Sequence, residues 1–244
     1  MSQPLIGIIV AMQEELEVVL QSLQQPQAHQ RAGMTFYQGI YAGSPVVAVI
    51  CGVGKVNAAL CTQILISEFH TQRIINIGVA GGLHPEIQPG DVVIADTLMQ
   101  HDMDLRPLGL ARGHFYRMDT HAFPSDPMLL QWARQACADL KNHRFFVGRI
   151  VTGDQFIASP ELAQELHQHF DALACEMESA SIAQVCFLNH IPFICIRSIS
   201  DNANTGAHMD FAQFTPIAAA NATTLLQNMI PLCQINADTI EFKA

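Results

Sequence analysis

Continuous apolar segments alternate with segments of helical periodicity along most of the chain. The apolar segments are rich in β-branched residues and predict buried strands over 5–11, 73–79, 91–99, 144–154, 172–177 and 192–200. Apolar residues at helical spacing predict helices near 13–24, 55–69, 126–140, 159–170, 178–189 and 213–230. Two further strands over 34–41 and 44–51 flank Ala42-Gly43 and predict a hairpin, whereas 100–125 predicts a long loop.

This alternation predicts an α/β fold with a single domain over residues 1–244. Strands that are apolar on both faces indicate a mixed, mostly parallel central sheet that helices cover on both sides, a three-layer α/β/α arrangement. No Pro/Gly/Ser-rich linker, charge block or internal repeat divides the sequence. A length of 244 residues suits one such domain.

Three of the predicted strands run into acidic residues. Glu15 follows the first strand, Glu176 and Glu178 lie at the end of another, and Asp201 closes a third. Carboxylates beside apolar strands are costly unless they are paired or used, and α/β sheets bind ligands at the carboxyl ends of strands. A parallel βαβ unit over 172–200 would place three of these acids on one edge of the sheet, where Glu15 joins them if its strand runs the same way.

Several carboxylates around a cleft suit the cleavage of a glycosidic bond. One acid protonates the leaving group, and another activates water or stabilises a cation-like sugar. Each acid also has a purely structural interpretation. Glu178 could complement the dipole of the following helix, and Asp201 could cap a turn.

Composition narrows the classes of function. The formal net charge is −10 with only twelve Lys and Arg and no basic cluster, so we expect no nucleic-acid partner. No apolar segment approaches the ~18 residues of a membrane span, and the N-terminus lacks the basic region of a secretory signal. Seven scattered cysteines favour reduced thiols and a cytoplasmic location.

Two motifs that could indicate a metal or cofactor do not support one. His101 to Asp104 reads HDMD, but consecutive side chains of a strand alternate faces, and no HExxH or paired CxxC accompanies it. The segment GVGK at 52–55 lacks the spacing of a P-loop or of GxGxxG. We therefore expect neither a metal nor a cofactor.

Six sequence blocks in order over residues 6 to about 214 resemble the 5′-methylthioadenosine/S-adenosylhomocysteine nucleosidases of the purine nucleoside phosphorylase superfamily. The blocks are IGIIVAMQEE, CGVGKVNAA, NIGVAGGL, TGDQFI, CEMESASIAQVC and RSISDNAN. The resemblance implies a phosphorylase-like fold and a homodimer. It implies hydrolysis of the N-glycosidic bond of those two nucleosides, releasing adenine and the 5-thio-ribose product.

The same resemblance implies roles for individual residues. Glu15 would activate the attacking water, Asp201 would donate a proton to adenine N7, and Glu178 would bind the ribose hydroxyls. Further positions implied around the substrate are Met177 and Arg197 at the ribose, Gly81, Phe156 and Ile157 at the purine, Met12 and Val53 as apolar walls, and Phe211 near the 5′ substituent. Leu105 and Leu108 would complete the 5′ pocket of the other subunit.

One position departs from the commoner family pattern. Many members have Ser at the position of Val79, where it helps to hold the catalytic aspartate, so we expect Ser200 or a backbone group to do so here. Val79, HDMDL and TGDQF also resemble members that hydrolyse 6-amino-6-deoxyfutalosine, which makes that nucleoside a second candidate substrate. The roles of Glu176, which we expect to be supporting, and of Asp154 stay open.

Two other functions compete with hydrolysis. A phosphorylase must bind a phosphate dianion, normally with several Arg or Lys, yet residues 1–30 contain neither. An acidic loop after the first strand favours neutral water over phosphate as the nucleophile. A non-catalytic nucleoside-binding protein on the same fold is the other alternative, and the presence of Glu15, Glu178 and Asp201 argues against it.

Overall fold

The computed structural model describes residues 3–138, 144–202, 220–221 and 224–234. Its strands are β1 (Ile6–Val10), β2 (Gln24–Arg31), β3 (Met34–Tyr41), β4 (Ser44–Ile50), β5 (Arg73–Gly82), β6 (Val92–Gln100), β7 (Phe123–Pro124), β8 (Phe145–Thr152), β9 (Ala172–Glu176) and β10 (Phe193–Asn202). Its helices are α1 (Gln13–Ser22), α2 (Lys55–Ser67), α3 (Pro127–Ala138), α4 (Pro160–Phe170), α5 (Ser179–Leu188) and the 3-10 turn η1 (Arg106–Leu108). Residues 220–221 and 224–232 are also helical.

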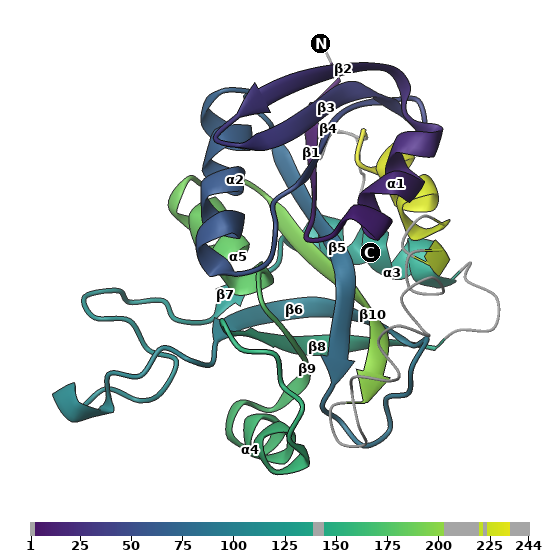
Figure 1. Ribbon diagram of the computed structural model, residues 1–244. Helices are drawn as coiled ribbons and strands as arrows, with labels where there is room; N and C mark the ends of the chain where they lie inside the picture. The colour runs from purple at the N-terminus through teal and green to yellow at the C-terminus, as the bar shows by residue number, and fades with distance from the viewer. Residues whose placement is uncertain (1–2, 139–143, 203–219, 222–223, 235–244) are drawn as a thin grey trace, which may run out of the picture.

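Helices cover both faces of the sheet, which confirms the three-layer prediction (Figure 1). On one face, Ile6 and Ile8 of β1 pack into a core with α1, α3 and the helical residues 224–232. On the other face, Ile9 of β1 packs into a second core with α2 and α5. Alternate residues of one strand therefore enter opposite cores, as the apolar sequence of β1 requires. Among the described residues, no helix is long and apolar enough to cross a membrane.

The strands form one mixed sheet of ten strands, part of which closes into a ring. The order is β10-β6-β8-β9-β5-β1-β4-β3-β2, with β7 beside β6 and an additional pairing between β10 and β5. The central pairings of β1 with β4 and β5, and of β5 with β10, are parallel. The pairings of β10 with β6 and of β9 with β5 are antiparallel, and they close the ring.

The predicted parallel βαβ unit over 172–200 is wrong in its topology. β9 pairs with β8 and, in the antiparallel sense, with β5, so β5 lies between β9 and β10. The acids still meet, because Gly81 of β5 pairs with Cys175 of β9 on one side and with Asp201 of β10 on the other. Their convergence thus depends on the ring closing at Gly81 and not on a crossover connection.

Strand β2 is an element that the sequence pattern did not predict. Its sequence QQPQAHQR is almost entirely exposed, and it pairs with β3 at the edge of the sheet. A strand with no buried face has no apolar alternation to reveal it, and Pro26 fits such an edge position. The predicted start of the last helix at 213 and the site residue Phe211 lie outside the described residues.

Candidate active site

A pocket with about 730 Å³ of empty space lies where β1, β5, β9 and β10 end. Its lining includes eleven of the predicted site residues: Met12, Glu15, Val53, Gly81, Phe156, Ile157, Met177, Glu178, Arg197, Ser200 and Asp201. A pocket that is largely apolar with a few convergent polar groups is typical of a small-molecule site. Segments far apart in sequence thus supply one cleft, as the acid-ended strands predicted.

Glu15 is held at the junction of three elements. It occupies the third position of α1, and its Oε2 accepts hydrogen bonds from the backbone N–H groups of Ala11 and Met12, each at 3.0 Å. Its Oε1 accepts the N–H of Val79 on β5, also at 3.0 Å. Burial raises the pKa of Glu15, while the charge of Arg197 and the three N–H donors oppose that rise. The carboxylate is therefore fixed in position and more basic than an exposed glutamate.

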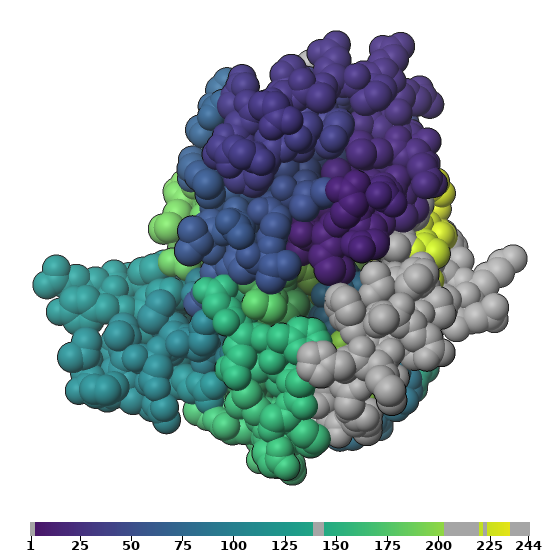
Figure 2. Space-filling view, in the orientation of Figure 1, coloured from purple at the N-terminus to yellow at the C-terminus, as the bar shows by residue number. Residues whose placement is uncertain are grey.

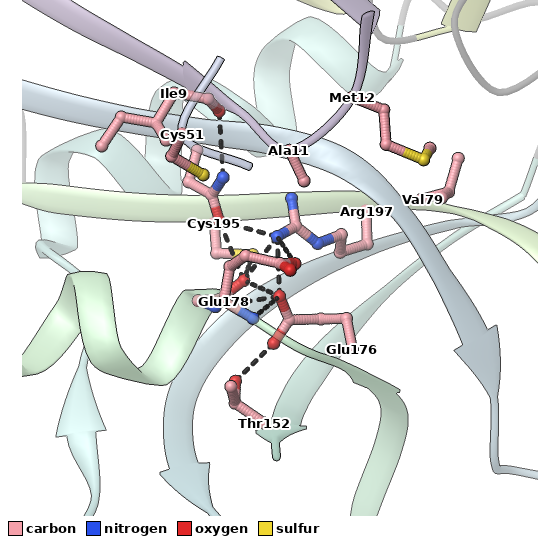
Figure 3. A network of polar contacts seen from close by, with 12 residues as sticks. Ile9, Ala11, Met12, Cys51, Val79, Thr152, Glu176, Glu178, Cys195 and Arg197 are labelled. Carbon is pink, nitrogen blue, oxygen red and sulfur yellow. Dashed lines mark hydrogen bonds and ion pairs between the residues drawn. The ribbon is translucent and has the colours of Figure 1, made fainter. Parts of the chain in front are cut away.

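Arg197 lies fully buried at the centre of a polar network (Figure 3). Its Nη2 donates to Glu176 Oε2 at 2.7 Å, and to Asn76 Oδ1 and Ser179 Oγ at 2.8 Å each. Its Nη1 has no hydrogen-bond partner within the described structure. The guanidinium is thus anchored from one side, and its other side faces the pocket that it lines.

Glu176 supports this network and does not present a free carboxylate. Besides Arg197, it accepts hydrogen bonds from the hydroxyl of Thr152, from the backbone N–H groups of Glu178 and Ser179, and from Ser179 Oγ. Burial alone would raise the pKa of Glu176, but Arg197 and these donors outweigh burial and lower it. This agrees with the expected supporting role.

Glu178 lies at the start of α5 and faces the start of α2. Its Oε1 accepts the backbone N–H of Gly54 at 2.9 Å, and Arg197 Nη2 lies 3.9 Å from its Oε2. Burial, reinforced by the nearby charge of Glu176, raises the pKa of Glu178 to about 8. A carboxyl group in this state can both accept and donate hydrogen bonds near neutral pH, which suits contact with hydroxyl groups.

Asp201 is buried near the end of β10 and lines the same pocket. Ser200 Oγ lies 2.8 Å from Asp201 Oδ2 and can donate a hydrogen bond to it. A break in the β5–β10 register between Ile199 and Asp201 allows Ser200 and Asp201 both to line the cavity, whereas regular strand neighbours point to opposite faces. Ser200 thus has the contact that we expected in place of the family serine at Val79.

The apolar walls of the pocket come from four loops. Met12 precedes α1, Val53 precedes α2, and Phe156 and Ile157 follow β8, while Met177 lies between β9 and α5. Phe156 is 43% exposed and Ile157 is buried. An exposed aromatic ring beside a buried aliphatic residue offers a surface on which a planar base can stack.

Some lining residues were not predicted from sequence. Gly78 lies under both Glu15 and Arg197, and a Cβ there would come 2.8 Å from Glu15 Oε1 and 2.9 Å from Arg197 Nη1. Ala11, Ala80, Gln155 and Cys175 also line the pocket, as do Val79, which stands in place of the family serine, and Glu176, whose role was left open. Small residues such as Gly78 carry no reactive group, so only a requirement for close backbone approach could have singled them out.

Leu105 and Leu108 do not line this pocket. They lie in the arm formed by residues 101–122, which extends away from the body (Figures 1 and 2). Leu108 is 66% exposed. The contact of Leu105 and Leu108 with another subunit, which the family resemblance implies, stays a prediction.

The pocket is strongly acidic in character. Glu15, Glu176, Glu178 and Asp201 line it, and Arg197 is the one cation among its described lining residues. Glu15, Glu178 and Asp201 can contact a bound ligand, as can Arg197. Both oxygens of Glu176 already accept hydrogen bonds from neighbouring residues. The arrangement can supply both an acid and a base to a single substrate. With one arginine among four acidic residues, the pocket is poorly suited to bind a polyanion.

The comparisons with known proteins agree with this geometry. The sequence profile of the phosphorylase superfamily matches residues 5–231. The chain is 39% identical over 226 residues to a 5′-methylthioadenosine/S-adenosylhomocysteine nucleosidase of Psychromonas ingrahamii, covering 92% of this chain and 97% of that protein.

Solved structures show the same similarity. The nucleosidase of Neisseria meningitidis in complex with methylthio-immucillin-A aligns with a TM-score of 0.89 at 35% identity, over 93% of this chain and 98% of that one. The futalosine hydrolase of Helicobacter pylori aligns with a TM-score of 0.88 at 31% identity, over 93% and 97%.

Proposed function

The chain belongs to the phosphorylase superfamily, and from that premise we propose that Glu15, Glu178 and Asp201 hydrolyse the N-glycosidic bond of adenine nucleosides. The enzyme is an N-glycosyl hydrolase of the 5′-methylthioadenosine/S-adenosylhomocysteine nucleosidase type. The observation that carries the assignment of residues is the convergence of these three carboxyl groups on one pocket. The test is release of adenine from either nucleoside by the purified protein.

The attacking water is proposed to lie between Glu15 and Arg197. Glu15 Oε1 and Arg197 Nη1 both lie within 3 Å of the point that a Cβ atom would occupy at position 78. Because residue 78 is glycine, that point is free of side-chain atoms. Glu15 would accept a proton from the water, and the unpartnered Nη1 of Arg197 would orient it. A base held by three backbone N–H groups needs no reorganisation as the reaction proceeds.

Asp201 is proposed to protonate adenine N7, so that adenine leaves as a neutral base. Glu178 is proposed to bind the ribose hydroxyls, with Gly54 and Arg197 fixing its position. As the bond breaks, positive charge develops on the sugar, and the charged carboxylate of Glu15 stabilises that charge. Phe156, Ile157 and Gly81 would hold the base on the Asp201 side of the pocket.

Water is favoured over phosphate as the nucleophile. A phosphate dianion would meet several carboxyl groups and a single arginine whose Nη2 is already committed to Glu176. Phosphate sites normally supply several cationic or N–H donors. Turnover in phosphate-free buffer is the decisive measurement, and strict dependence on added phosphate would refute hydrolysis.

6-Amino-6-deoxyfutalosine is proposed as a second substrate. The similarity to the Helicobacter pylori futalosine hydrolase supports this, together with Val79, which lines the pocket through an apolar side chain. The comparison of kcat/KM for the three nucleosides tests it. A value for this nucleoside more than about 10³-fold below that for methylthioadenosine would contradict the proposal, since a difference of that size exceeds the discrimination that a methylene group provides.

We further propose a homodimer in which the arm of each subunit completes the 5′ pocket of the other through Leu105 and Leu108. An apolar surface on α2 and α5 supports this interface, with Val56 78% exposed and Leu188 59% exposed. Monomeric proteins rarely expose large apolar surfaces of this kind. The mass in solution, compared with 26.8 kDa for one chain, tests the proposal.

Residues 1–244 are proposed to form one domain that acts in the cytoplasm without a cofactor. All seven cysteines are free and buried, which suits a reducing compartment. Within the described residues, no cluster of His, Cys, Asp and Glu has the arrangement of a metal site. Activity that survives dialysis against a chelator would support the absence of a metal requirement.

A further inference from the structure

Three residues outside the pocket form a closed cycle of hydrogen bonds beside it. Lys55 donates through its backbone N–H to Asp154 Oδ1 at 2.8 Å, and Asp154 donates through its own N–H to Asp102 Oδ2 at 3.0 Å. Asp102 Oδ1 accepts Lys55 Nζ at 2.7 Å, which completes the cycle. We call these three residues the clamp.

The clamp joins three segments that are distant in sequence. Lys55 is the first residue of α2, Asp102 begins the arm, and Asp154 belongs to the loop after β8. Each of these residues belongs to a motif (GVGK, HDMD or TGDQF), and the proposed reaction gives none of the three a role. None of the three lines the pocket.

The residues next to the clamp either line the pocket or hold a residue that lines it. Gly54 precedes Lys55, and its N–H holds Glu178 Oε1. Gln155, Phe156 and Ile157 follow Asp154 directly and line the cavity. Two of the surfaces that we assign to the nucleoside, the ribose acceptor and the base-stacking loop, are therefore tied to the same cycle.

The carboxylate of Asp102 is the only part of the clamp that comes from the arm. Burial raises its pKa, but the hydrogen bonds from Lys55 and Asp154 outweigh burial and lower it, so the group stays charged. Two charge-assisted hydrogen bonds of this kind are strong and directional. An amide in place of the carboxylate has one acceptor oxygen and must turn a donor toward either Lys55 or Asp154.

We propose that Asp102 is a positioning residue for the nucleoside site, acting through Lys55 and Asp154 on Glu178 and on the loop 155–157. This rests on the proposed function. The clamp does not touch Glu15 or Asp201, which other elements hold. Glu178 and loop 155–157 contact the substrate before and during the reaction alike, and loss of such uniform binding raises KM and leaves kcat unchanged.

The test compares Asp102→Asn with the wild type on methylthioadenosine. We expect KM to rise about 10- to 100-fold, kcat to stay within about threefold, and the affinity for adenine alone to fall in parallel, because small displacements of positioning groups have effects of this size. A purely structural role would instead reduce the folded fraction, lowering kcat and the melting temperature with KM unchanged. That result would overturn the inference.

Glu165→Gln is the matched control. Glu165 on α4 pairs with Arg112 and also tethers the arm, but within the described residues no hydrogen bond or ion pair joins it to the clamp. We expect its KM to equal that of the wild type, and an equal rise in both variants would refute a specific role for Asp102.

Lys55→Met removes Nζ and keeps the backbone N–H. It therefore tests whether Asp102 acts on the nucleoside site through its ion pair with Lys55. The double variant with Asp102→Asn should be no worse than the more impaired single variant, whereas additive effects would contradict a shared path. An inactive wild type would refute the proposed function itself, while an active wild type with an unaffected Asp102→Asn refutes only this inference.

Discussion

Replacing Gly78 by alanine tests the proposed position of the attacking water most directly. The added Cβ would lie 2.8 Å from Glu15 Oε1 and 2.9 Å from Arg197 Nη1, where ordinary contacts begin at 3.4 Å. These side chains would have to move by roughly 0.6 and 0.5 Å, the differences between 3.4 Å and the two distances. Both are buried and held by several hydrogen bonds, so neither can move freely.

The methyl group would also occupy the space that we assign to the water. Misplacement of a reacting group by about 1 Å can cost ~10²-fold, and overpacking of a buried site costs about 1–3 kcal/mol of stability. We therefore expect kcat to fall by at least about 10²-fold in Gly78→Ala. Adenine affinity should change little, because the base is assigned to the Asp201 side of the pocket.

The assay is adenine release at saturating nucleoside, with adenine binding measured in parallel by calorimetry. Gly148→Ala is the control, since its Cβ would crowd Leu173 Cδ1 at 2.7 Å and neither Gly148 nor Leu173 lines the pocket. That variant should lose stability and keep its kcat. A Gly78→Ala enzyme with near-normal kcat would refute both the position of the water and the pairing of Glu15 with Arg197.

Three further predictions concern the acids. Asp201→Asn cannot donate a proton and should lose about 10²- to 10⁴-fold in kcat with substrate binding retained, as measured by turnover and calorimetry; near-normal turnover would contradict its role. Glu176→Gln should lower the free energy of unfolding in urea by about 3–5 kcal/mol, because the buried Arg197 loses its nearest charge partner and keeps only Glu178 at 3.9 Å; an unchanged midpoint would be the opposing result. The raised pKa of Glu178 means that the folded state binds more protons than the unfolded state between pH 4.5 and about 8, so stability should fall as pH rises, by at most ~1.4 kcal/mol per unit for one proton. Glu178→Gln should lose that contribution, and an identical pH profile of unfolding would count against it.

Much of the site was predictable because its chemistry depends on residue types that are visible in the sequence. Acids at the ends of apolar strands are conspicuous, and the family resemblance assigned them roles that the pocket accommodates. Ser200 is an example of an expectation that the structure supports in detail, since its hydroxyl lies 2.8 Å from Asp201 Oδ2. Periodicity also located the helices and buried strands, because those elements bury one or both faces.

The errors came from features that periodicity does not encode. The exposed strand β2 has no apolar alternation, so the pattern passed over it. The order of β9, β5 and β10 depends on long-range pairing at Gly81, whereas the sequence suggested only that neighbouring elements are adjacent. Gly78 is essential to the geometry only because two distant side chains converge above it. Such requirements become visible once the chain is folded.

The closed ring of strands also has a consequence for how the protein is made. β5 ends at Gly82, but its partner β10 begins at Phe193, more than a hundred residues later. During synthesis, the edge of β5 that pairs with β10 stays unpaired until most of the chain has been made. Such long-range pairing is slow and prone to aggregation. Glu15 emerges early and Asp201 late, so the nascent chain has no reaction centre until its last strand is in place.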